Sequence, residues 1–169
     1  MGLARRGNEA NAIAQSEMHR SFYAYTMTID LDRVGIDCEK DKEGNLVKEY
    51  IIPQEEKAQR VQALLKTVQF LYRDIKGRRE NLSPLFIVGG VYDRKNPYFD
   101  GRLQLNKQKL NTKMLEEVIS SDADIKDNTE VGYLEGSFLN DADITEKLTA
   151  IHISKFFDNL IGKVEAVYK

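Results

Sequence analysis

Apolar and polar residues alternate cleanly in SFYAYTMTIDL, residues 21–31. One face of this stretch would carry Tyr23, Tyr25, Met27, Ile29 and Leu31. β-branched and aromatic residues at a period of two are typical of a β-strand. The pattern therefore predicts a strand from Ser21 to Leu31, with Ile29 and Leu31 on the better-buried face.

The next two segments have different patterns of apolar residues. The segment IDCEKDKEGNLVKEYII has two weakly alternating arms around Glu43, Gly44 and Asn45, which indicates an exposed hairpin or a mobile loop. From residue 53 to residue 76 the apolar positions are spaced by three and four, as in an amphipathic helix. Pro53 fits the first turn of that helix and Gly77 its end, so we expect a helix from Pro53 to Lys76.

The run PLFIVGGVYD predicts a strand from Leu85 to Tyr92 that is buried on both faces. Gly89 and Gly90 inside it indicate a bulge or the close approach of another backbone. Beyond it the pattern predicts a short strand in RLQLN, a helix in TKMLEEVISS, an edge strand in TEVGYLEGSF and helical structure from Ile144 to Tyr168. Strands interleaved with helices favour an α+β or α/β architecture.

Composition is that of one globular domain, with 41% hydrophobic and 31% charged residues in 169. The formal net charge of −2 provides no overall field for nucleic acid, so a polyanion site must be a local patch. A single cysteine excludes an internal disulfide and fits a reducing compartment. With no apolar run of membrane-spanning length and no visible signal peptide, we expect a soluble cytoplasmic protein that does not contact membranes.

Catalytic and metal-binding chemistry is weakly represented. The two histidines, His19 and His152, lie far apart in the sequence, and the acidic stretch SSDADIKDN lacks the glycine and terminal glutamate of a calcium loop. No nucleophile elbow, phosphate-binding loop or dinucleotide fingerprint is present in the sequence. We therefore predict no catalytic residue, no metal site and no cofactor.

Cations cluster in three places, and aromatic residues accompany them. The candidate RNA-binding residues are Arg5, Arg6 and Arg20, then Tyr23 and Tyr25, then Lys76, Arg78 and Arg79, then Arg94 and Lys95. Basic side chains bind phosphates, and aromatic rings on a sheet stack single-stranded bases. Two other interpretations stay open: Lys76 at a helix end would favour the helix dipole, and the tyrosines could belong to the core.

The segments GNEANAIAQSEMHRSFYAYTMTIDLDRVG and LYRDIKGRRENLSPLFIVGGVYD, in this order, resemble the backbone subunit of class 1 CRISPR effector complexes. The similarity is greatest to the DevR, or autoregulator, form of type I-B systems, and it extends from Met1 to about Pro97. The resemblance implies an antiviral defence protein with an RRM-like (ferredoxin-like) β-α-β-β-α-β palm. It also implies several copies polymerised along the crRNA, and no catalytic site.

Within that resemblance, residues 21–31 match the third strand of the palm, residues 53–76 its second helix and residues 85–92 its fourth strand. Residues 1–20 correspond to a thumb-like return segment and residues 21–169 to the C-terminal portion of the palm. The N-terminal half of the family core has no counterpart in this sequence. The expected fold is thus α+β, a partial RRM/ferredoxin-like domain with inserted loops.

The resemblance implies that Arg5 and Arg6 contact RNA phosphates from the thumb side. Arg20 would contact RNA at the entry to the palm strand. A basic turn in the palm groove would do so through Lys76, Arg78 and Arg79. Its partners would be crRNA, further copies of the same chain and other Cascade subunits, with the target DNA strand left open. Two alternatives remain: an assembly fragment that binds proteins without RNA, and a metal-dependent ribonuclease.

Overall fold

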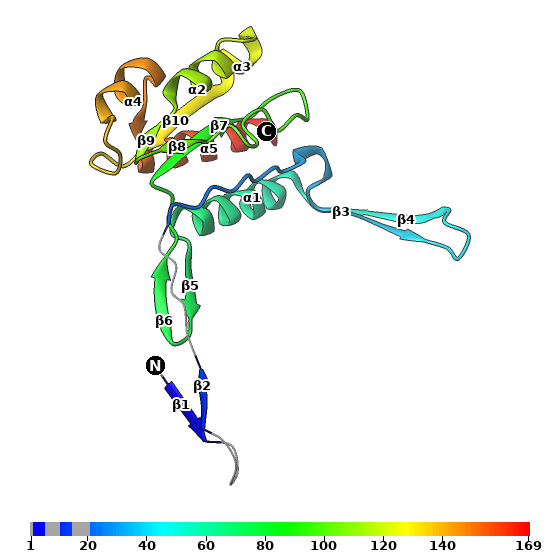
Figure 1. Cartoon of the computed structure of the whole chain (residues 1–169). Coiled ribbons are helices and arrows are strands. Elements are labelled where there is room, and N and C mark those ends of the chain that lie inside the picture. Colours follow the sequence, from blue (N-terminus) through cyan, green and yellow to red (C-terminus); the bar gives the residue numbers. More distant parts are fainter. Residues whose placement is uncertain (1, 6–10, 15–20) are drawn as a thin grey trace.

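The computed structural model describes residues 2–5, 11–14 and 21–169. The architecture is α+β, as predicted: helices pack against a three-stranded sheet, and hairpins extend away from this body (Figure 1). At the N-terminal end, β1 (Gly2–Arg5) pairs antiparallel with β2 (Asn11–Ala14). Among the described residues, no helix is both long and apolar enough to cross a membrane.

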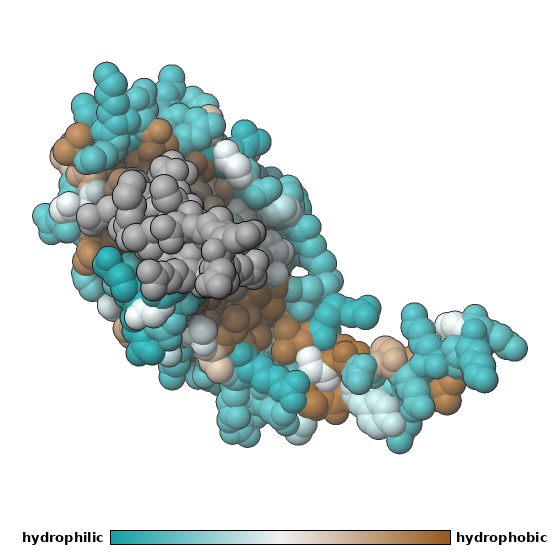
Figure 2. All heavy atoms as spheres, turned by 60° about the horizontal axis from the view of Figure 1, so that its bottom comes forward, coloured by the Kyte–Doolittle hydropathy of each residue, from teal (hydrophilic) through white to brown (hydrophobic). Residues whose placement is uncertain are grey.

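The predicted exposed hairpin is confirmed. After a short 3-10 helix, η1 (Leu31–Arg33), strands β3 (Ile36–Lys40) and β4 (Leu46–Ile51) pair antiparallel and extend from the body (Figure 1). The Asp41 carboxylate closes the turn by accepting the amides of Glu43 and Asn45, each at 2.9 Å. Figure 2 shows that apolar side chains are interspersed among hydrophilic ones along this hairpin.

The long helix is confirmed, but the predicted end is wrong. Helix α1 (Gln54–Gln69) stops before Phe70, and the chain turns into β5 (Tyr72–Ile75) and β6 (Arg78–Asn81). Lys76 and Gly77 have φ angles of 49° and 79°. Two successive residues with positive φ are incompatible with a helix and form the type I′ turn of a tight hairpin. Lys76 therefore lies in a hairpin turn and not at a helix end.

The central sheet has the strand order β11-β10-β7. The predicted strand in residues 85–92 is confirmed as β7 (Phe86–Gly90), which pairs antiparallel with β10 (Thr129–Tyr133). Its expected burial on both faces is wrong, because β7 is the last strand in the order and all five of its residues are only partly buried. Strand β11 (Ile151–His152) pairs with β10 in parallel, so β10 is central and its prediction as an edge strand is wrong. Gly132 of β10 lets Phe156 of α5 pack closely against the strand, because a Cβ on Gly132 would lie 2.7 Å from Cβ of Phe156.

The predicted strand in residues 21–31 is also wrong. Residues 21–30 run across the body without pairing to any strand in the described part of the chain (Figure 1). Side chains hold the segment in place: the Phe22 ring lies 6.0 Å from that of Phe138, and Thr26 donates a hydrogen bond to Asp100 at 2.8 Å. Ile29 and Leu31 pack against the core, as the alternation predicted.

The remaining elements complete two core clusters. They are β8 (Leu105–Asn106), β9 (Lys109–Leu110), α2 (Thr112–Ile119), α3 (Ala123–Asn128), α4 (Asp141–Leu148) and α5 (Ile153–Val167). The short strand in RLQLN and the helix in TKMLEEVISS are thereby confirmed. The predicted helical tail is confirmed only in part, because β11 divides it into the two helices α4 and α5. One cluster centres on Leu115 and Ile144, and the other joins α1 to α5 around Phe157.

Substitution of Glu130 should change how stability depends on pH. Burial raises the pKa of Glu130, but hydrogen bonds from Lys163 (2.8 Å) and Asn159 (2.7 Å) lower it overall below its usual value. A lowered pKa stabilises the fold at neutral pH, and this contribution is lost as the pH falls through the folded-state value. We expect Glu130→Gln to cost roughly 1 kcal/mol at pH 7, because both partners keep some solvent contact, and to cost less on acidification. Urea unfolding of the unmodified protein and the variant between about pH 3 and pH 7 measures this cost. The same difference in unfolding free energy at every pH would contradict the prediction.

Candidate nucleic-acid interface

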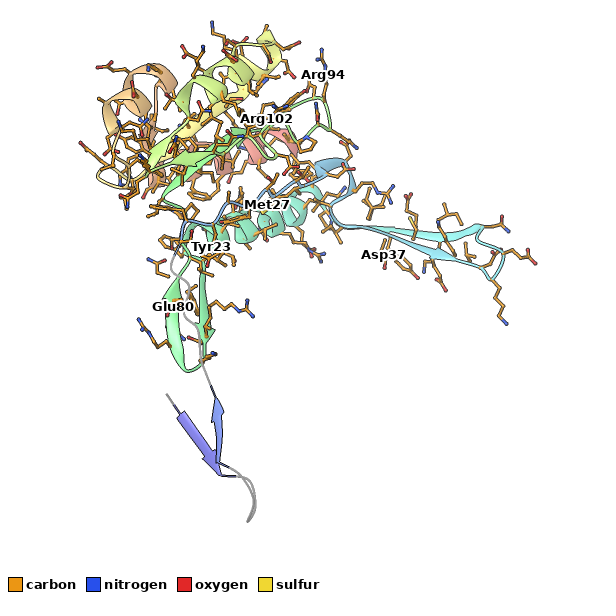
Figure 3. The ribbon with its side chains drawn as sticks, in the orientation of Figure 1. Tyr23, Met27, Asp37, Glu80, Arg94 and Arg102 are labelled. Atoms are coloured by element: carbon orange, nitrogen blue, oxygen red, sulfur yellow. The ribbon has the colours of Figure 1, made fainter. Side chains whose placement is uncertain are left out.

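The hairpin formed by β5 and β6 extends from the body on the side of α1's C-terminal end (Figure 1). Figure 3 places Glu80 on this hairpin and Tyr23 close to where it joins the body. Its ladder pairs Tyr72 with Asn81, Arg73 with Glu80, Asp74 with Arg79 and Ile75 with Arg78. The hydrogen bond from the Leu82 amide to the Leu71 carbonyl, at 2.8 Å, extends the ladder into the body.

Side chains alternate between the two faces of a hairpin. One face therefore carries Tyr72, Asp74, Arg79 and Asn81, and we name it the stacking face. The opposite face carries Arg73, Ile75, Arg78 and Glu80, and we name it the cationic face. The two arginines that the sequence presents as neighbours, Arg78 and Arg79, thus point to opposite sides.

On the stacking face, Arg79 is held by two partners. Its Nε and Nη2 donate to the two carboxylate oxygens of Asp74, at 3.1 and 3.3 Å. Its Cζ lies 4.4 Å from the centroid of the Tyr72 ring. The hydrogen bond to Asp74 is the main reason that the pKa of Arg79 is raised. The result is an ordered, electrically balanced surface.

The cationic face has an excess of positive charge. It carries Arg73 and Arg78 against the single carboxylate of Glu80, and Arg78 Nε lies 3.4 Å from a Glu80 oxygen. The Arg78 side chain is 73% exposed. Lys76 adds a third cation from the turn. Sequence reasoning missed Arg73 because the residue was assigned to the helix, where nothing placed it beside Arg78.

The third cationic group lies apart from the hairpin. Arg94 occupies the far side of the body in Figure 3, with Nη1 3.4 Å from Asp122. Lys95 Nζ is 2.9 Å from Asp30 and 2.8 Å from Asp32, and hydrogen bonds to these two carboxylates raise its pKa. These pairs tie the loop after β7 to its surroundings. Contact of Arg94 and Lys95 with RNA stays a prediction, and it would compete with carboxylates already in place.

The first cationic group falls in a part of the chain that is incompletely described. Arg5 is the last residue of β1, whereas Arg6 and Arg20 lie outside the described residues. Tyr23 and Tyr25 are 71% and 51% exposed, so the interpretation of these residues as core tyrosines is wrong. Tyr23 lies near the base of the β5–β6 hairpin (Figure 3), and RNA contact by either tyrosine stays a prediction.

The acidic stretch in residues 120–128 has a structural explanation. The Asp122 side chain caps helix α3 by accepting the amide of Asp124 at 2.9 Å, and it also pairs with Arg94. Across residues 21–169, no group of three or more histidine, cysteine, aspartate or glutamate side chains is arranged to hold a metal ion.

Comparison with known proteins identifies one family. The model of the CRISPR-associated negative auto-regulator DevR/Csa2 family matches residues 3–113, well over half of the chain. The matched range includes α1 and the hairpins β3–β4 and β5–β6. Searches of the curated proteins and of the solved structures each found no significant match.

Proposed function

The chain belongs to the CRISPR-associated DevR/Csa2 family, and on that premise we propose that it is a crRNA-binding backbone subunit of a type I CRISPR interference complex. It holds the guide RNA through phosphate contacts that do not depend on base sequence. Copies of the chain associate along the guide and with other Cascade subunits. The subunit binds RNA and catalyses no reaction. The family match is the observation that carries this proposal.

The geometry of the β5–β6 hairpin supports this role. A guide changes sequence with every spacer, so its holder must bind the backbone and not the base edges. The cationic face brings Arg73 and Arg78 together on a surface that extends from the body, with Lys76 at its tip. In a chain of net charge −2, such a local excess of cations is the kind of surface that phosphates require.

We expect the double variant Arg73→Ala/Arg78→Ala to weaken binding to single-stranded RNA. Each lost phosphate contact lowers the slope of log K against log[salt] by about 0.7, so two lost contacts lower it by about 1.4 and the affinity by about 25-fold at 0.1 M salt. Filter binding of guide-length RNAs of unrelated sequence, from 50 to 400 mM salt, measures both quantities. The RNAs should bind with similar affinity.

A charge-matched control is Lys113→Ala/Lys169→Ala. These two lysines are 83% and 77% exposed and lie on or just after helices distant in sequence from the hairpin. The control should keep the salt slope of the unmodified protein. If the unmodified protein shows no RNA binding at 50 mM salt, the proposed function is wrong, and an assembly role through protein contacts replaces it.

A further inference from the structure

The stacking face of the hairpin has a different chemistry from the cationic face. Arg79 commits Nε and Nη2 to Asp74, at 3.1 and 3.3 Å, so its charge is balanced by a fixed carboxylate. An arginine used as a phosphate ligand would present this fork of donors to the phosphate. Asp74 instead occupies the fork, which makes Arg79 a poor phosphate ligand in this arrangement.

The same contacts make Arg79 a flat, oriented surface. Its Cζ lies 4.4 Å from the Tyr72 ring centroid, so the guanidinium covers the ring, and the two hydrogen bonds to Asp74 restrain its rotation. The Arg79 side chain is 66% exposed, which leaves much of the group outside the Tyr72 contact open to solvent. Guanidinium planes and aromatic rings are the two protein surfaces on which unpaired bases stack.

We propose that Tyr72 and Arg79 form a stacking subsite for one unstacked nucleobase of the bound RNA, with Asp74 as the positioning residue. This inference rests on the proposed function, because RNA is the ligand. The hairpin then contacts an RNA strand in two ways: the cationic face holds phosphates and the stacking face holds a base. Stacking needs no base-edge hydrogen bonds, so it is compatible with a guide of any sequence.

A purely structural role makes different predictions. Cross-strand pairs and cation–π contacts stabilise hairpins. In a purely structural role, the Tyr72–Arg79–Asp74 cluster would stabilise the β5–β6 hairpin and would not contact a base. In that case a variant would change affinity for any RNA backbone equally. A base-stacking subsite distinguishes RNA with bases from RNA without them.

The test compares two probes of equal length and charge: single-stranded oligoadenylate and an abasic ribose-phosphate strand. The unmodified protein should bind the oligoadenylate roughly 5- to 100-fold more tightly, the range expected for one stacked base. Tyr72→Ala and Arg79→Lys should both remove most of this preference and leave the salt slope unchanged. Tyr72→Phe retains the ring and should retain the preference.

Two further variants sharpen the test. Asp74→Ala releases Arg79, so the base preference should fall while the salt slope rises by about 0.7 as Arg79 becomes available to a phosphate. Arg60→Lys is the matched control, since Arg60 on α1 is exposed and pairs with Glu56 at 2.8 Å. It should leave both quantities unchanged. Replacing one adenine with 2-aminopurine reports stacking directly through quenched fluorescence.

Three results would overturn the inference. Equal binding of both probes by the unmodified protein removes the base subsite but leaves the proposed function standing. Retention of the full preference by Arg79→Lys, with a lower salt slope in Arg79→Ala, makes Arg79 a phosphate ligand. Absence of binding to either probe overturns the inference and the proposed function together.

Discussion

Phe157→Ala should lower the free energy of unfolding by about 3–5 kcal/mol, the usual cost of truncating a buried phenylalanine. Phe157 is completely buried, and its ring packs edge-to-face against Phe156 with 5.6 Å between centroids. The cluster around it includes Val61 and Leu65 of α1. Removing the ring therefore opens a cavity in the core that joins α1 to α5. Because α1 leads directly into the β5–β6 hairpin, we also expect weaker RNA binding.

Thermal and urea unfolding measure this effect. At 2–4 °C per kcal/mol for a chain of this size, the melting temperature should fall by roughly 10 °C. Phe70→Ala is the matched control, because Phe70 is 68% exposed at the end of α1 and its loss should change stability by less than about 0.5 kcal/mol. Equal effects of the two substitutions would show that α5 does not close the core.

Local periodicity predicted those elements whose structure is decided by their own residues. Helix α1 has Ala58, Val61 and Leu65 on one buried face, which is the stripe that the spacing indicated. Strand β7 is the apolar run before Tyr92, and the β3–β4 hairpin turns at the predicted Glu43–Asn45 stretch. The α+β class follows from the order of these elements, so it too could be predicted.

The end of α1 could not be predicted, because one signal has two meanings. Leu71, Tyr72 and Ile75 continue the helical spacing, and a glycine after lysine fits either a helix end or a type I′ turn. This ambiguity extends to the site. On a helix, Arg78 and Arg79 would follow the last turn together, whereas on β6 they lie on opposite faces and acquire different partners.

Contacts between residues far apart in the sequence could not be predicted either. In the sequence Lys95 belongs to a basic patch, but in the structure it donates a hydrogen bond to Asp30, which lies 65 residues earlier. Residues 21–31 have the alternation of a strand, but a strand also requires a hydrogen-bonding partner, which alternation does not specify. In β10, glycine suggested a weak edge strand, whereas Gly132 is needed for the approach of Phe156.

Gly90→Ala should be the most damaging of the small substitutions in the sheet, at roughly 3 kcal/mol, the upper end of the usual cost of overpacking. A Cβ on Gly90 would lie 2.8 Å from the carbonyl carbon of Asn128 and closer still to its oxygen. That carbonyl belongs to the backbone and accepts a hydrogen bond from Lys163 at 3.2 Å. It cannot move aside as a flexible side chain would, so the end of β7 must separate from the start of β10.

Gly89→Ala provides the control within the same strand. A Cβ on Gly89 would meet nothing within 4 Å, and Gly89 does not have a positive φ angle. Alanine there restricts the unfolded chain, so we expect stability to be unchanged or to rise by up to about 1 kcal/mol. Urea unfolding of the two variants should thus differ by about 3 kcal/mol or more for the same added methyl group. Similar stabilities would mean that the contact of Gly90 with Asn128 does not constrain β7. A clear difference would show that Gly90 is required because the backbone of Asn128 approaches it closely. The glycine pair in the sequence indicated such an approach as one possibility, but it could not identify Asn128 as the partner.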